Sequence, residues 1–284
     1  MTLRASLLPA LVCLALPVMG QSLPEKFEKN RTVWEESLAR GNAALVRKDT
    51  ETILAQDGPS VNPSDYNAMH AMVAVMGLAA NACVHEGAWE AAVAHLQKAT
   101  QAATDNAATA DGTFTKLRQQ HQENLTTWRN DVEKLEQRSR DLDAQGGLTS
   151  DQIRTRTQIQ AQLEENRNAI TQSVASLAEI DRIMAMLKKE QDGYAASLSE
   201  WMGFLAKEKA DLAHKGSAHA YVAEKLEQVR GDDAKPQVER LTYARRLLVL
   251  DPANVECRRL VDGLMGKGGD EEPPLPPKKK HGRE

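Results

Sequence analysis

Aromatic residues are scarce in this chain, and no segment has the alternating pattern of a β-strand. Tryptophan, tyrosine and phenylalanine together make up 4% of its 284 residues. Long segments consist mainly of Ala, Leu, Gln, Glu, Lys and Arg, without runs in which Val, Ile or Thr alternate with polar residues. Such segments favour helices, so the sequence predicts an all-α protein.

Cysteine is also rare, and its spacing fits no known metal motif. Of the three cysteines, Cys13 lies in a segment that we expect to be removed, which leaves Cys83 and Cys257 far apart in the sequence. Export would permit a disulfide between them. We favour the alternative that both are small buried residues on helix faces.

The chain lacks an excess of basic charge and, after its first residues, any long apolar run. It has 36 basic and 40 acidic side chains, a net charge of −4. This mild acidity argues against nucleic acid as a partner. We also expect no membrane span in the mature chain, because no later stretch is long and apolar enough.

The N-terminal segment 1–20 has the pattern of a signal peptide. Arg4 precedes the apolar run Ala5–Met19, and Gly20 offers a small residue at the end of the segment. We therefore expect cleavage after Gly20 and export to a periplasm or beyond. An uncleaved membrane anchor is the alternative, although the run is shorter than a span of about 20 residues and two prolines interrupt it.

Leucine-class side chains recur at every seventh position in the middle of the chain. The repeat consists of Leu163, Ile170, Leu177, Met184, Gln191, Leu198, Leu205 and Leu212. A seven-residue apolar repeat of this length specifies a coiled coil. A shorter apolar seam precedes it and consists of Leu125, Trp128, Val132, Leu135 and Leu142. We expect the two seams to cover each other.

Paired glycines between the two seams predict a turn. Gly146 and Gly147 end one helix, and Thr149 is placed to cap the next with Gln152 reaching back. The sequence therefore predicts an antiparallel hairpin of 113–145 against 151–184, about 50 Å long. Whether the first of these helices continues back through 104–113 stays open.

The heptads of the second helix outrun the first helix. They continue to Leu212, and their apolar face needs another cover. We expect residues 190–212 to pack on residues 70–100, which would bring the two ends of the chain together.

One segment upstream of the seams resembles a tetratricopeptide (TPR) repeat. The residues that carry the resemblance are Met76, Ala79, Ala80, Cys83, Gly87, Trp89, Ala92, Leu96 and Ala99. Small residues at these spacings let two antiparallel helices approach, and Gly87 stands at the expected turn. Further upstream, Gly41–Leu45 followed by Lys48-Asp49 resembles the first helix and turn of a weaker repeat, with Gly41 equivalent to Ala80.

The C-terminal part resembles the close of a TPR unit. An apolar helical stripe from Val238 to Leu248 ends in Leu250-Asp251-Pro252. The pattern predicts Asp251 as the N-cap of a following helix with Pro252 as its first residue.

These features divide the chain into five parts. They are a signal peptide (1–20), N-terminal TPR-like repeats (21–106), an antiparallel coiled-coil hairpin (107–216, turn near 145–150), C-terminal TPR-like helices (217–265) and a Pro/Lys-rich tail (266–284). We expect the repeats at the two ends to pack together while the hairpin projects from the middle. The composition of the tail predicts that it is disordered. It is either a solubilising end or a ligand for a proline-recognising or anionic surface.

Patterns that carry catalysis or bind a cofactor are missing. No histidine has a second ligand four residues away that would mount a metal on one helix face. Gly146-Gly147 follows a helix instead of a strand, and no Gly-x-Ser-x-Gly motif occurs. We therefore predict no enzyme, no cofactor and no metal.

The TPR resemblance implies a protein or peptide partner. Asn42 and Asn81 would be equivalent on the inner helices, where this family commonly faces a bound peptide, with Leu38 and Leu45 on the same surface. The lysine that holds a terminal carboxylate in the family is replaced by Leu38. The alternative is that these asparagines serve helix packing alone.

The expected function is that of an extracytoplasmic scaffold or adaptor, with possible self-association through the coiled coil. A structural envelope spacer, a coiled-coil oligomer and a periplasmic chaperone that binds clients are the alternatives.

Overall fold

The computed structural model describes residues 22–266, and these residues form helices and turns without a strand. The predicted all-α class is therefore confirmed. The expected signal peptide and the tail from residue 267 lie outside the described residues. In chain order the helices are α1 (Leu23–Ala39), α2 (Ala43–Asp57), a 3-10 turn (Gly58–Ser60), α3 (Tyr66–His85), α4 (Trp89–Asp143), α5 (Ser150–Lys215), α6 (Ala218–Gly231), α7 (Gln237–Leu250) and α8 (Val255–Leu264).

Two tight turns of the same construction join α1 to α2 and α3 to α4. Gly41 and Gly87 occupy them with φ of 80° and 76°. In each turn the glycine N–H donates to the carbonyl three residues before it, and the next N–H donates to the carbonyl five residues before it. This pattern closes a helix C-terminus and needs the left-handed conformation that glycine adopts freely.

The expected boundaries of the weaker, upstream repeat are wrong. Gly41 was expected within its first helix, but it lies in the turn that follows α1. Gly41 is equivalent to Gly87, not to Ala80, which lies inside α3. Lys48-Asp49 lies within α2 and forms no turn.

The helices α1–α3 and α6–α8, with the adjoining ends of α4 and α5, are called the body here, and α3 is its central element. It contacts α1, α2, α4 and α7, and its buried side chains include Ala71, Val73, Val75, Ala79, Ala80, Ala82 and Cys83. Contrary to expectation, its 20 residues would suffice by length and composition to cross a membrane. Packing on four helices requires apolar side chains on several faces, and this accounts for its composition.

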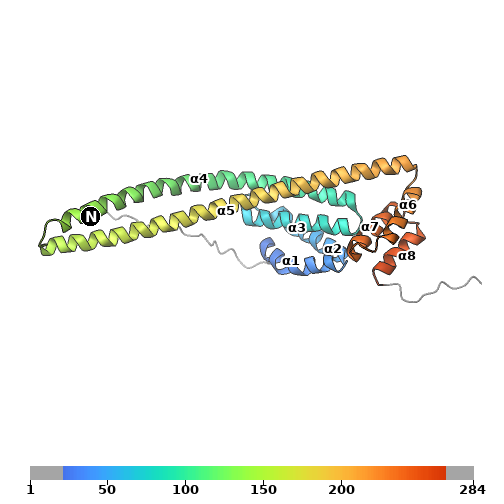
Figure 1. The fold of residues 1–284 in the computed structure, drawn as a ribbon, viewed down its shortest axis with the longest axis horizontal. Coiled ribbons are helices and arrows are strands. Elements are labelled where there is room, and N and C mark those ends of the chain that lie inside the picture. Colours follow the sequence, from blue (N-terminus) through green and yellow to red (C-terminus); the bar gives the residue numbers. More distant parts are fainter. Residues whose placement is uncertain (1–21, 267–284) are drawn as a thin grey trace, which may run out of the picture.

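Helices α4 and α5 form one long antiparallel pair that runs along the body and continues well beyond α1–α3 (Figure 1). Helix α4 is unbroken for 55 residues, so it passes through 104–113 and the expected boundary at 106 falls inside it. Side-chain contacts join 118 to 181, 139 to 160 and 143 to 156. The two numbers in each pair add up to 299. The two helices therefore keep one register along the arm, which is the part of the α4–α5 pair from Phe114 to the turn and back.

The hairpin turn and the apolar seam agree with the sequence. Gly146 and Gly147 both have positive φ, and Thr149 and Gln152 form the expected capping box. No heptad residue from Leu163 to Leu212 is exposed. Leu163 and Leu205 are buried and the other heptad residues are half-buried, so this stripe holds α5 against its neighbours from 163 to 212.

The predicted contact between residues 190–212 and residues 70–100 is confirmed. The Tyr194 hydroxyl donates to the Val73 carbonyl oxygen over 3.3 Å and lies directly over Gly77, where a Cβ would be 2.2 Å from the hydroxyl. Trp201 stands edge-on to Trp89, with ring centroids 5.5 Å apart. Helix α5 therefore connects the arm with the body.

Helices α6, α7 and α8 form a second core around Val222, Ala244, Leu247 and Cys257. The expected role of Asp251 is wrong: α8 begins three residues later, at Val255, and its N-cap is Asn254, whose side chain accepts from the Cys257 N–H. Asp251 instead ends α7, and its carboxylate accepts from His219 Nδ1.

Candidate functional site

One of the four predicted partner-binding residues lies in the core instead of on the surface. Asn42 lies in the turn before α2 and Asn81 lies on α3, so their expected equivalence on two inner helices is wrong. Both are exposed, as is Leu45, whereas Leu38 is 5% exposed and belongs to the core with Trp34 and Val46. Leu38 lies on the apolar face of α1, which packs into the core. It was assigned to the binding surface because Gly41 was expected inside a helix instead of in the turn after α1.

A buried ion cluster centred on Arg246 forms the junction between α7 and the ends of α4 and α5 that lie in the body. Its guanidinium donates through Nε to both carboxylate oxygens of Glu208 at 3.0 Å, through Nη1 and Nη2 to Glu90 at 2.8 Å, and through Nη1 to the Gly87 carbonyl at 3.1 Å. It also lies over the Trp89 ring, 4.7 Å from the centroid. Arg246 is 1% exposed and Glu208 is 4% exposed. The cluster thus ties α7 to α4 and α5.

The neighbouring Arg245 joins the two tight turns. It donates to the Gly41 carbonyl at 3.1 Å and to the His85 carbonyl at 3.2 Å. Together with Arg246 on Gly87, it places positive charge at the C-terminal ends of α1 and α3, where unpaired carbonyls concentrate negative charge. Helix α7 therefore closes both hairpins from one side.

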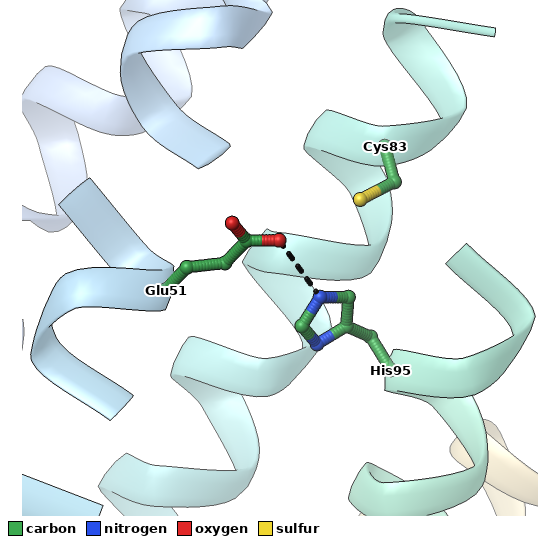
Figure 2. A group of neighbouring side chains, drawn as sticks. All are labelled: Glu51, Cys83 and His95. Atoms are coloured by element: carbon green, nitrogen blue, oxygen red, sulfur yellow. Dashed lines mark hydrogen bonds and ion pairs between the residues drawn. The ribbon is translucent and has the colours of Figure 1, made fainter. Parts of the chain in front are cut away.

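A second cluster, Glu51–Cys83–His95, lies between α2, α3 and α4 (Figure 2). One carboxylate oxygen, the thiol sulfur and one imidazole nitrogen all lie within 4.8 Å of one another. His95 Nε2 is 3.2 Å from Glu51 Oε1. Cys83 is buried, and the two others are half-buried.

Arg47 and Glu86 surround this cluster with paired charge. Arg47 donates through Nε to Glu51 Oε1 at 3.0 Å and through Nη1 to Glu86 Oε2 at 3.1 Å. Burial acts to raise the pKa of Glu51, but hydrogen bonds from Arg47 and His95 outweigh it and hold this pKa below its usual range. Burial raises the pKa of the Cys83 thiol to about 11. The free protein therefore holds a protonated thiol beside an ionised carboxylate.

Sequence reasoning missed this cluster because its members are 32 and 12 residues apart on three helices. Motifs of metal sites are read from short spacings on one helix or loop. The detectable signal was the small buried Cys83 of the repeat-like segment, but its neighbours depend on how the hairpins pack. Both Cys83 and Cys257 are buried and free, as the favoured interpretation predicted.

Comparison with family models, with curated proteins and with solved structures found no match for the chain.

Proposed function

We propose that the protein is a non-enzymatic, extracytoplasmic scaffold or adaptor, in which two degenerate TPR-like hairpins and the helices α6–α8 form a body that carries a coiled-coil arm. Partners of the body and partners of the arm would be held at a fixed separation. The observation that carries the proposal is the free length of the α4–α5 pair beyond the body.

The arm leaves the body near Phe114. There the Phe114 ring stands edge-on to Tyr66, at the start of α3, with centroids 5.5 Å apart. From Phe114 to Asp143 the pair continues for about 45 Å at the helical rise per residue. A paired rod of this length spans distance and presents two helical surfaces, which suits a contact remote from the body.

The arm presents apolar side chains as well as charge. Leu117, Ile153 and Val174 belong to the exposed large hydrophobic residues of the protein. The arm also carries cross-helix ion pairs such as Arg167 with Glu136, whose N and O atoms are 2.8 Å apart. Mixed apolar and charged helix faces are the surfaces through which coiled coils select partners.

The arm is attached in a way that fixes its direction. Glu208 at the body end of α5 is buried in the ion cluster with Arg246, and Trp201 packs on Trp89. Movement of α5 against the body would strip the buried carboxylate of its donors, which is energetically costly. A rigidly attached arm transmits position, as a scaffold requires.

A shortened arm tests the proposal. Removing 119–139 from α4 and 160–180 from α5 deletes three heptads from each helix and keeps both the register and the Gly146-Gly147 turn. We expect the variant to fold, with an arm about 32 Å shorter. Crosslinking in the cell envelope, followed by binding assays with each purified partner, should show that it loses the partners of the arm and keeps those of the body.

Two results would contradict the adaptor function. If the shortened chain keeps every partner of the intact chain at equal affinity, the arm has no role in binding. If the intact chain is an inert monomer by light scattering and crosslinks to nothing, neither part binds. A spacer would be indicated if the chain with the shortened arm loses the partners of the body as well as those of the arm.

A further inference from the structure

Three kinds of metal ligand meet at one point between α2, α3 and α4 (Figure 2). From this convergence we propose that Glu51, Cys83 and His95 bind a zinc ion. The site is separate from the arm and does not depend on the proposed scaffold function.

The donor set selects the class of metal. Zinc takes thiolate, imidazole and carboxylate ligands, whereas magnesium and calcium take oxygen ligands almost exclusively. Bond lengths of about 2.0–2.3 Å place the ligand atoms of a tetrahedral zinc site about 3.3–3.8 Å apart. The three atoms here already lie within 4.8 Å of one another, so small side-chain rotations close the site.

The orientation of the imidazole distinguishes an ion site from a nucleophile relay. In a relay the nucleophile and the orienting carboxylate occupy opposite ring nitrogens of the histidine. Here Glu51 lies 3.2 Å from Nε2 of His95, and the Cys83 sulfur lies on the same edge of the ring (Figure 2). Three donors that point to one centre form a coordination shell.

Charge and protons balance when the ion binds. The Cys83 S–H bond breaks, its proton passes to solvent, and the sulfur forms a bond to zinc; His95 coordinates through Nε2 with its proton on Nδ1. The thiolate and the Glu51 carboxylate then offset the two charges of the ion, while Arg47 stays paired with Glu86. Arg47 also holds Glu51 in place from outside the shell.

Solvent can reach the carboxylate side of the cluster. A surface depression is bordered by Arg47, Glu51 and Glu86, and it leads to the carboxylate side of the cluster. Water there would complete a tetrahedral shell.

Zinc would bind the two N-terminal hairpins together. Glu51 belongs to the α1–α2 hairpin, whereas Cys83 and His95 belong to the α3–α4 hairpin. Because these groups meet only in the folded body, an ion bound there stabilises the native state.

Cobalt substitution tests the site in the intact, untagged chain. Titration of the metal-free protein with Co²⁺ should give a thiolate-to-cobalt charge-transfer band that saturates at one ion per chain, and added Zn²⁺ should remove it and raise the melting temperature. Cys83→Ser should abolish the band, and His95→Gln should weaken affinity by more than about tenfold, since even outer-shell changes cost 10–100-fold. Cys257→Ser is the matched control, because Cys257 is equally buried but donates only to the Ala244 carbonyl.

Circular dichroism checks that each variant is folded. If Cys83→Ser does not fold, the loss of affinity in His95→Gln tests the site in its place. The proposal is overturned if the folded wild type shows no charge-transfer band with Co²⁺ in excess. It is equally overturned if the band survives Cys83→Ser or is lost in Cys257→Ser.

Discussion

At the scale of single residues, Arg246 shows how one buried side chain decides the position of several helices. Its donors reach Glu208, Glu90 and the Gly87 carbonyl, which lie on or beside two other helices. Breaking such a pair leaves a charge in the protein interior without a partner, and this penalty exceeds the net value of the pair itself.

Arg246→Met should therefore lower the free energy of unfolding by about 3–5 kcal/mol, because Glu208 stays buried without its donor. Chemical denaturation measures the loss. The double variant Arg246→Met/Glu208→Leu should recover a large part of it, since the uncompensated charge is removed as well. A single variant as stable as the wild type would show that the junction does not depend on this cluster.

Gly87 is a second residue on which the junction depends. It has φ of 76°, and a Cβ there would lie 2.4 Å from the backbone nitrogen of Arg246. Gly147 in the arm turn has φ of 68° with nothing within 4 Å of its Cβ position. A side chain at Gly87 would therefore be disfavoured both by the backbone conformation and by a steric clash, whereas a side chain at Gly147 would be disfavoured by the conformation alone.

Gly147→Ala should lower the free energy of unfolding by about 1–2 kcal/mol through backbone strain. Gly87→Ala should lower the free energy of unfolding by the same strain and by a further 1–3 kcal/mol, roughly, because helix α7 must move away from the added methyl group. Thermal or urea unfolding of the two variants compares these effects directly. Equal losses would show that α7 does not press on the turn.

At the scale of elements, the contact between α3 and α5 includes ionisable groups that respond to pH. His70 Nδ1 of α3 lies 2.9 Å from Glu190 Oε1 of α5. This contact raises the pKa of His70 above 6.5 despite its partial burial; Glu28 adds to the effect and Arg31 opposes it. On the same helix, burial and then Arg245 lower the pKa of His85 below 6.5.

The two histidines should give opposite pH dependences of stability. With its pKa raised in the folded state, His70 contributes stability that is complete below pH 6.5 and is lost as the pH rises through the folded pKa. His85 has a lowered folded pKa, so the unfolded chain binds its proton first and stability falls as the pH drops below 6.5. Unfolding of His70→Gln and His85→Gln across this range measures both.

Relative to the wild type, His70→Gln should lose most stability at acidic pH, and His85→Gln should gain there. Parallel pH profiles for the wild type and both variants would contradict the assignment.

At the scale of the whole molecule, residues 22–266 form a body from which the paired helices α4 and α5 project (Figure 1). The constant register between α4 and α5 means that each segment of the arm is held by the segment opposite. Removal of matched heptads should therefore leave the body and the turn unchanged, and this makes the shortened arm a fair test of function. The zinc site and the arm lie on different parts of α4, so the two experiments fail independently.

The amino-acid sequence by itself determined the helical class, the paired seams, the glycine turn with its Thr149 cap and the contact between α5 and the body. These follow from local propensity and from apolar periods, which are written into consecutive residues. Tertiary structure alone decided the turn at Gly41, the start of α8, the Arg246 junction and the Glu51–Cys83–His95 cluster. Each depends on which side chains of distant helices meet, and the sequence period that buries a helix face does not state what covers it.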